Sequence, residues 1–215
     1  MTTSVCLSTA YLAPVQYYCK LWSYPKVILE TAEHYVKQTY RNRCLIATAN
    51  GVTVLTVPIE KPDSEKCPTK DIRISSHGRW QHLHWNTFVS AYGLSPFFDY
   101  YRDELEPFYT RRFEFLLDFN EALRHLICNW LDIQPKITCT SRYLTSVAAD
   151  DFRCAIRPKH AENDPAFTPQ PYYQVFGHKH GFLPNLSIID LLFNMGPESV
   201  LVLQRSVCDT PELKK

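Results

Sequence analysis

The spacing of hydrophobic positions changes twice within the first thirty residues, and each change predicts a new element. Residues 4–8 form a short apolar run that predicts a buried strand. Residues 15–23 repeat apolar side chains at helical spacing, and residues 27–30 return to a strand-like run. Strand, helix and strand in this order have the outline of a βαβ unit.

A β-hairpin is predicted farther along the chain, where a turn signal separates two strand-like runs. The runs are residues 44–48 and 52–59, and Asn50-Gly51 lies between them. Asn and Gly tolerate the positive φ angles of a tight hairpin turn, which favours this interpretation. Residues 72–75 alternate apolar and polar side chains and predict one more short strand.

Helical spacing dominates the middle of the chain and its C-terminal part. The longest periodic segment is 111–131, whose apolar side chains recur at three- and four-residue intervals and form one stripe. The other predicted helices are residues 79–92, a helix that begins at Ser95 and ends at Pro107, and a helix that begins at Ser187 and is interrupted at Gly196-Pro197.

The remaining segments complete the predicted fold. Residues 137–143 and 172–176 predict strands, whereas residues 150–171 have no periodicity and predict an irregular loop, long enough to cover a site. Together the elements predict an α/β fold with a mixed sheet, an N-terminal βαβ-like unit, a β-hairpin and flanking helices; the alternative is α+β. We expect one domain over residues 1–205 and a frayed tail over 206–215.

Composition favours a packed domain and argues against several function classes. Hydrophobic residues make up 45% and charged residues 21% of the 215 residues, which excludes a disordered chain. The net charge is +1 without a basic stripe, so we expect no nucleic-acid partner. No run approaches the roughly 18 apolar residues of a membrane span, so we expect no transmembrane segment.

The cysteines point to a reducing compartment. None of the eight cysteines lies in a CxxC arrangement, which argues against a zinc ribbon. The first residues lack the basic start and apolar stretch of a secretory signal. We therefore expect reduced, mostly buried cysteines in a cytoplasmic protein.

The polar run at residues 37–43, KQTYRNR, is the first candidate site. Arg41 and Arg43 each offer a bidentate fork to a carboxylate or phosphate. Gln38 and Asn42 offer amides that suit a sugar hydroxyl or an amide. The alternative is a solvated connector that contains a structural arginine.

The segment 176–190, FGHKHGFLPNLSIID, is the second candidate. His178 and His180 would share one face of a strand, which suits a metal, but the spacing shows no third ligand. We therefore expect no metal, and favour a hydrogen-bonding or acid–base role for one histidine. The amides at Ser187 offer an anion site in which Asp190 takes part, although plain helix capping by Asp190 is the stronger interpretation.

A third candidate is WQHLHW at residues 80–85. Trp80 and His84 are four residues apart and share a helix face, which favours a packed Trp beside a partly buried His. The chain contains no GxGxxG, Walker, GxSxG or HExxH motif, so the sequence identifies no cofactor.

Taken together, these blocks resemble the WbqC-like protein family, in particular its shorter bacterial members. The N-terminal segment 8–17, STAYLAPVQY, is similar to the family's opening His-Gln-Pro-x-Tyr-Leu-Pro, with Ser-Thr-Ala in place of its His-Gln-Pro. The opening matches in kind at Tyr11, Leu12 and Pro14. The other similar blocks are YRNR with the hairpin that follows it, Trp80 with His84, SPFFDYY at 95–101 and FLPNLSIIDLLFNMGPES at 182–199.

The resemblance implies a role in bacterial surface-polysaccharide (O-antigen or capsule) biosynthesis. On that basis we hypothesise a transferase-like protein that modifies a nucleotide- or lipid-linked sugar, by acyl or aminoacyl transfer. Its substrate would be a small or sugar-linked molecule with an anionic group; the sequence does not indicate the oligomeric state. The alternatives are a non-catalytic binding or assembly protein of the same pathway, and a zinc enzyme using His178 and His180. The assigned residues are Arg41 and Arg43 for the anionic group, Tyr11, Gln38 and Asn42 for the acceptor, and His84 or His180 for proton transfer.

Overall fold

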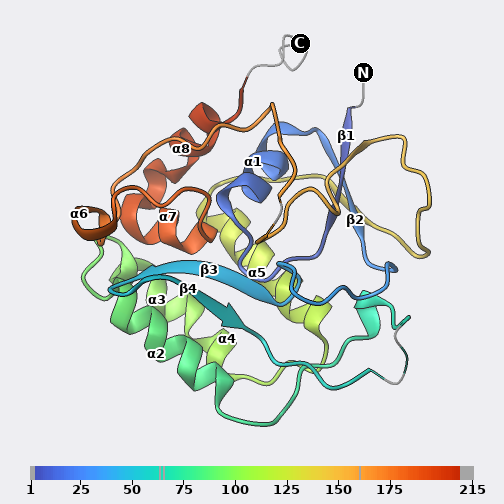
Figure 1. The fold of residues 1–215 in the computed structure, drawn as a ribbon, viewed down its shortest axis with the longest axis horizontal. Coiled ribbons are helices and arrows are strands. Elements are labelled where there is room, and N and C mark those ends of the chain that lie inside the picture. The colour runs from blue at the N-terminus through green and yellow to red at the C-terminus, as the bar shows by residue number, and fades with distance from the viewer. Residues whose placement is uncertain (1–2, 63, 65, 160, 209–215) are drawn as a thin grey trace.

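A parallel sheet of four strands forms one half of the molecule (Figure 1). The computed structural model describes residues 3–62, 64, 66–159 and 161–208. The strand order is β5-β2-β1-β6, and every neighbouring pair is parallel. The predicted βαβ unit is therefore confirmed at the centre of this sheet. Its elements are β1 (Ser4–Ser8), α1 (Val15–Ser23) and β2 (Lys26–Glu30), and the outer strands are β5 (Ile137–Cys139) and β6 (Asp150–Asp151).

The predicted hairpin forms a second, antiparallel sheet of β3 (Arg43–Thr48) and β4 (Gly51–Thr56). Thr48 pairs with Gly51, so the turn consists of Ala49 and Asn50. Only Gly51 of the Asn-Gly pair has a positive φ, of 100°, which glycine adopts without steric cost. Parallel and antiparallel pairing are thus both present, and the predicted α/β class is confirmed.

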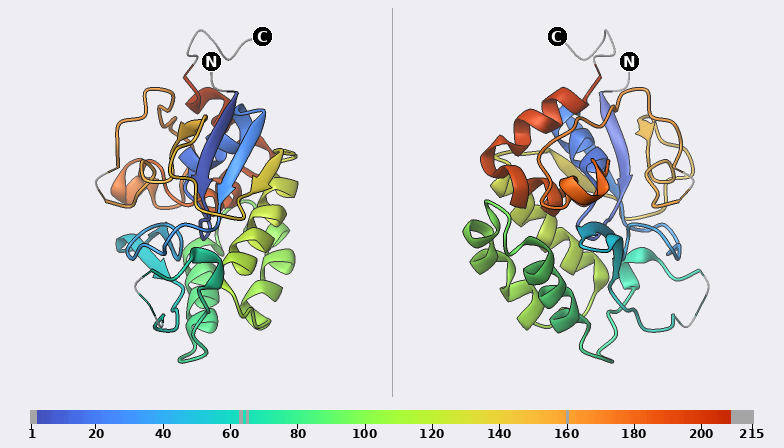
Figure 2. Two further views of the ribbon diagram at one scale, coloured as in Figure 1. Left: turned by 90° about the vertical axis from the view of Figure 1, so that its right-hand side faces the viewer. Right: turned by 60° about the vertical axis from the view of Figure 1, so that its left-hand side comes forward.

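The helices cover both sheets and join the two halves (Figures 1 and 2). α1 packs against α7 and α8 beside the parallel sheet, whereas α2 and α4 pack together below the hairpin. α5 reaches both halves, because Asn120 bonds Thr9 Oγ1 and the Arg41 carbonyl, while Leu116 N–H donates to Ile72. The helices are α2 (Trp80–Tyr92), α3 (Phe98–Leu105), α4 (Pro107–Thr110), α5 (Leu116–Trp130), α6 (Gly177–His180), α7 (Ile188–Met195) and α8 (Ser199–Ser206), with 3-10 turns η1 (Thr69–Asp71) and η2 (Gly196–Glu198).

Several predicted boundaries are wrong, and side-chain hydrogen bonds explain two of them. The helix expected from Ser95 begins at Phe98, because the Ser95 hydroxyl bonds the Tyr92 carbonyl and closes the end of α2. The strand expected at 172–176 is absent among the described residues, since the Gln174 amide bonds both backbone groups of Leu183. His178 and His180 therefore lie on the short helix α6.

Three other segments are shorter than predicted. The helix expected from residue 111 begins at Leu116, and the strand at 137–143 ends at Cys139. Residues 72–75 form isolated bridges rather than a named strand. In the expected tail, α8 extends to Ser206 and Val207 bridges Phe167, while residues 209–215 lie outside the described residues.

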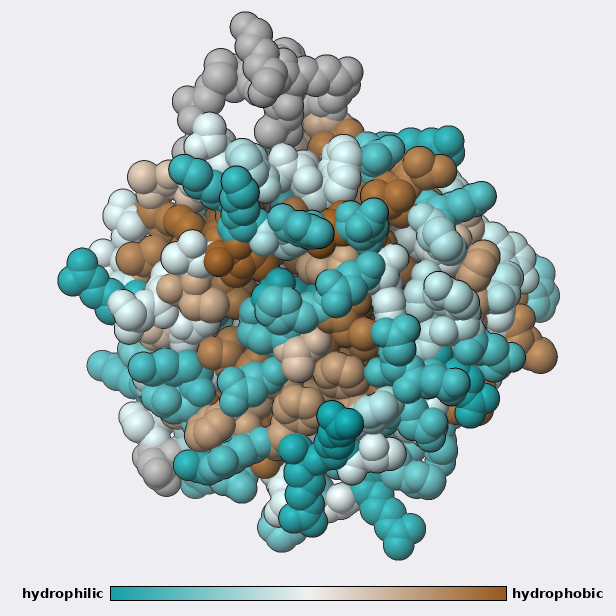
Figure 3. All heavy atoms as spheres, turned by 180° about the vertical axis from the view of Figure 1, so that it is seen from behind, coloured by the Kyte–Doolittle hydropathy of each residue, from teal (hydrophilic) through white to brown (hydrophobic). Residues whose placement is uncertain are grey.

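The hydrophobic core is one cluster that runs from β1 to α8 and includes both sheets. α5 contributes Leu116, Leu123 and Ile127 of the predicted stripe, and Phe119 is buried beside them. On the rear face, hydrophobic residues form patches separated by hydrophilic ones (Figure 3). Among the described residues, no helix has both the length and the apolar character needed to cross a membrane.

Candidate functional site

Polar side chains gather where β1, β2 and β6 end, at the carboxyl edge of the parallel sheet. Ser8 is the last residue of β1 and pairs with Glu30, the last residue of β2. Arg153 follows β6, and the segment after β2 brings Glu33 and Arg41 to the same place. We call these five residues the carboxyl-edge cluster. Open α/β sheets bind ligands at this edge, which makes the cluster the leading candidate site.

Arg41 is held firmly inside this cluster. Its side chain is 4% exposed, and Nε and Nη2 bond the two carboxylate oxygens of Glu33 at 2.9 and 2.7 Å. Nη2 also donates to Ser8 Oγ at 2.8 Å. Two parallel bonds to one carboxylate are the strong, oriented form of an ion pair. The structure thus gives Arg41 a structural role beside any part in binding.

Arg153 occupies the other side of Ser8 and bridges two carboxylates. Its guanidinium forks onto Asp151 and donates from Nη1 to Glu30 and to the Leu144 carbonyl. The hydrogen bonds from Arg153 lower the pKa of Asp151 below its ordinary value. Glu30 is fully buried, and its other acceptor sites take Ala32 N–H, Thr140 Oγ1 and Leu144 N–H.

A small cavity lies between the two arginines. Its volume is about 20 Å³, which is close to the space of one water molecule. The lining residues are Ser8, Thr9, Ala10, Tyr17, Thr39, Tyr40, Arg41, Phe152, Arg153 and Ile156.

The segment that follows β6 covers this cavity and is fastened to α1. Lys20 and Asp164 form a buried ion pair of 2.7 Å, and the Gln16 amide donates to the same carboxylate oxygen. The Lys20 ammonium also lies 4.3 Å from the centroid of the Phe152 ring, which lines the cavity. The predicted loop at 150–171 therefore does cover a polar site. It is anchored at Asp150, which accepts from the Tyr24 hydroxyl, and near its other end, where Thr168 N–H donates to the Ser206 carbonyl.

Tyr11 and His84 meet in a second, separate cluster beneath the hairpin. The Tyr11 hydroxyl bonds His84 Nδ1 at 2.9 Å and the Tyr109 hydroxyl at 2.8 Å. The imidazole also bonds the Thr56 carbonyl, and burial lowers the His84 pKa to about 4. A neutral ring that donates to Thr56 must accept at Nδ1, so Tyr11 donates to His84 and Tyr109 donates to Tyr11. We call Tyr11, His84 and Tyr109 the aromatic network.

The other predicted residues of the polar run lie outside the carboxyl-edge cluster, each in a different environment. Asn42 is buried and its Nδ2 donates to the Val57 carbonyl, so it holds the segment that directly follows β4. Arg43 is partly buried at the start of β3, and within the described residues its Nε has no hydrogen-bond partner. Gln38 is exposed, with a φ of 62°. Of the run, only Arg41 belongs to the carboxyl-edge cluster.

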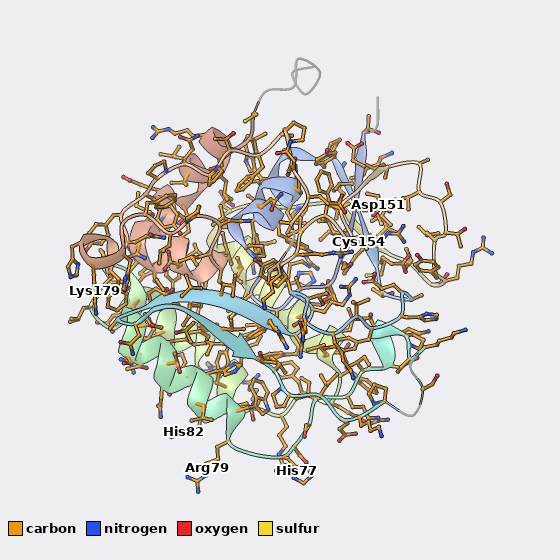
Figure 4. All side chains as sticks on the ribbon, viewed as in Figure 1. His77, Arg79, His82, Asp151, Cys154 and Lys179 are labelled. Atoms are coloured by element: carbon orange, nitrogen blue, oxygen red, sulfur yellow. The ribbon has the colours of Figure 1, made fainter. Side chains whose placement is uncertain are left out.

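The C-terminal candidates lie elsewhere. His180 Nε2 is 3.2 Å from the Thr48 carbonyl, and Lys179 Nζ donates to the Ala49 carbonyl. α6 therefore packs against the hairpin turn (Figure 4). The same view places Asp151 beside the parallel sheet, far from Lys179. The described residues contain no group of three or more His, Cys, Asp or Glu side chains arranged to hold a metal.

Asp190 does not cap α7, although it lies in the first turn of that helix. The fully buried carboxylate accepts hydrogen bonds from Tyr92, Tyr172 and Gln174. Burial raises the Asp190 pKa, and the three donors partly offset that rise. The Ser187 hydroxyl bonds the Leu12 carbonyl instead of an amide of α7. Asp190 thus anchors the irregular segment before α7.

Four of the five members of the carboxyl-edge cluster were not predicted as site residues: Glu30, Glu33, Arg153 and Ser8, which entered only through the comparison with the family's opening. Glu30 ends the apolar run of β2, and a charged residue in that position was an available signal. The sequence around Glu33 contained no comparable signal. Arg153 lies in an aperiodic segment, and its place beside Ser8 depends on the pairing of β6 with β1.

Comparison with known proteins places the chain in a family. The model of the WbqC-like protein family matches residues 9–164, and the chain belongs to that family. The match ends before the block at 182–199. A similar protein is "Uncharacterized protein Rv1507c" from Mycobacterium tuberculosis, with 24% identity over 192 residues, covering 77% of this chain and 81% of that protein. No solved structure matches.

Proposed function

We propose that this chain is a transferase that acts on a nucleotide- or lipid-linked sugar in surface-polysaccharide biosynthesis, and that it binds the anionic group of that sugar at the carboxyl-edge cluster. One observation carries the proposal: the Arg41 guanidinium donates to Ser8 Oγ, this hydroxyl donates to the Arg153 carbonyl, and both arginines line one cavity at the carboxyl edge of a parallel sheet. Guanidinium forks match phosphate and carboxylate oxygens, and this edge is where such folds hold ligands.

Binding at this cluster requires the cover to move. The cavity has the space of about one water molecule, so a phosphate enters only when the segment around Phe152 shifts. The phosphate then replaces Ser8 Oγ or Glu33 as the acceptor for Arg41. His84, His180 and Glu33 all lie outside the cavity lining, but Glu33 bonds Arg41, which does line the cavity, and Glu33 is therefore the proposed proton carrier.

A thermal-shift screen against nucleotide sugars, acyl carriers and amino acids tests the binding site. For any compound that stabilises the wild type, Arg41→Lys keeps the charge beside Glu33 but loses the fork, and should abolish the stabilisation. Arg43→Lys is the matched control, because Arg43 lies outside the cavity lining, and should leave the shift unchanged. Equal shifts in the wild type and in Arg41→Lys would contradict the proposal.

The second candidate is a non-catalytic binding or assembly protein of the same pathway. Among the described residues that line the cavity, none is a histidine or cysteine that could activate Ser8. Cys6 is buried nearby, and burial raises its pKa to about 12, which keeps it a thiol. Mass spectrometry of a stabilising donor incubated with candidate acceptors separates the two functions: a transferred group supports the enzyme, and binding without any product supports the second candidate.

A further inference from the structure

The outer edge of β4 has backbone N–H and C=O groups without hydrogen-bond partners within the described part of the chain. The hydrogen-bond pattern between β3 and β4 identifies the residues that carry them. In an antiparallel pair, residues alternate between those that bond the neighbouring strand and those whose backbone groups point away. Val57 N–H donates to the Asn42 carbonyl at 2.8 Å, which fixes this alternation. With the register of the hairpin, the backbone groups of Val52, Val54 and Thr56 point away from β3.

The two outer edges of the hairpin differ in how they are covered. On the β3 edge, the Leu45 carbonyl accepts Ser187 N–H at 2.8 Å. On the β4 edge, the Thr56 carbonyl accepts the His84 ring. The N–H and C=O groups of Val52 and Val54, which point away from β3, have no hydrogen-bond partner within the described part of the chain. Two residues of β4 therefore form an open strand edge.

The side chains on this edge lack the features that keep strands apart. Val52 and Val54 are 49% and 51% exposed, on the outer face of the hairpin. The sequence of β4, Gly-Val-Thr-Val-Leu-Thr, contains no charge and no proline. Proteins usually protect an open edge with lysine, proline or a bulge, so an unprotected apolar edge is suited to the addition of another strand.

We propose that this edge binds the β4 strand of a second copy of the chain. A two-fold axis through Thr53 brings identical surfaces together, and because Val52-Thr53-Val54 has the same sequence in both directions, a valine lies opposite each valine across that axis. In that register the backbone groups of Val52 bond those of the partner subunit's Val54, and the reverse pairing forms as well. The four valine side chains then lie on one face of a sheet shared by two copies.

A groove of about 320 Å³ runs between the hairpin turn and α2, lined among others by Asn50, Leu83 and Thr87. Leu83 is largely exposed there, and Val52 and Val54 are not among the residues that line this groove. One strand per copy buries less than the roughly 1,200–2,000 Å² of a stable interface, so the dimer should be weak and concentration-dependent.

Sedimentation velocity of the full chain over a wide concentration range tests the dimer. The wild type should change from monomer to dimer as concentration rises. Val54→Lys places like charges across the two-fold axis and should weaken association at least about tenfold, or 1.4 kcal/mol. Leu201→Lys, on the exposed side of α8, is the matched control and should not change it. A wild type that stays monomeric, or equal effects of both variants, overturns the proposal.

A cysteine at the two-fold axis tests the register independently. Thr53 of each copy would face its equivalent as a pair without mutual hydrogen bonds, with Cα atoms about 4.5 Å apart, which a disulfide can span. Thr53→Cys should give an oxidised dimer on a non-reducing gel. The wild type and Leu201→Cys carry the same exposed Cys139 and Cys154 and should not. Cross-linking of Thr53→Cys no greater than in these controls overturns the proposed register.

Discussion

The carboxyl-edge cluster and the aromatic network are both buried and polar, yet they satisfy their polar groups by different means. The cluster pairs full charges, Arg41 with Glu33 and Arg153 with Glu30. The aromatic network is neutral, a chain of hydroxyls that ends on His84. A neutral chain is satisfied internally, whereas an ionic cluster can exchange one of its ions for a charged ligand. The ionic region is therefore the better candidate for binding.

The largest expected effect comes from breaking a charge pair. Arg41→Met leaves the buried carboxylate of Glu33 without its partner and should lower the free energy of unfolding by about 3–5 kcal/mol. Urea unfolding measures this loss. The double variant Arg41→Met, Glu33→Gln removes both charges and should recover most of it. A double variant as unstable as the single one would show that the ion pair is not the cause.

A pH change should affect the aromatic network through His84. Burial lowers the His84 pKa from 6.5 to about 4, so the unfolded chain binds the proton more readily than the folded one. Stability should therefore decrease as pH falls from 6.5 to 4, by about 3 kcal/mol.

His84→Gln is the control for this pH effect, since an amide can bond both neighbours without titrating. Unfolding of the wild type and of His84→Gln at pH 7 and pH 4 gives the comparison. The difference in stability between the two proteins should change by about 3 kcal/mol over that interval. A difference that does not depend on pH would contradict the lowered pKa.

The smallest expected effect distinguishes positions within the aromatic network. Tyr11→Phe leaves the Tyr109 hydroxyl and His84 Nδ1 without their partner, and should cost about 1–3 kcal/mol. Tyr109→Phe keeps the bond from Tyr11 to His84 and should cost about 0.5–1.5 kcal/mol. Thermal unfolding of the two variants gives the order. If Tyr109→Phe were the more damaging, the donor directions assigned to the network would be wrong.

Local pattern predicted the fold better than it predicted the site. Apolar spacing was sufficient for the βαβ unit, the hairpin and α5, since each buries one regular face. It failed at 172–176, where the Gln174 side chain takes the place of a strand partner. Arg41 was identified from its chemistry, but its contact with Glu33 depends on a loop conformation that no spacing encodes.

Contacts between distant parts of the chain, which residue spacing does not encode, also determine where Arg153 and the two histidines lie. Arg153 reaches Ser8 because two strands about 145 residues apart in the chain become neighbours. The sequence offered His84 and His180 as alternatives for one role. The structure places them at opposite ends of the hairpin, His84 at Thr56 and His180 at Thr48. Topology, rather than residue type, separates the candidates.

The buried ion pair between Lys20 and Asp164 has a consequence for synthesis on the ribosome. β1, α1 and β2 are synthesised before the other elements of the described fold, yet α1 carries an ammonium whose partner is 144 residues away. At 5–20 residues per second, the ribosome needs roughly 7–29 s to make that partner. Until then Lys20 stays hydrated and β1 lacks its neighbour β6. The N-terminal unit thus waits, incompletely packed, for the segment that covers the candidate site.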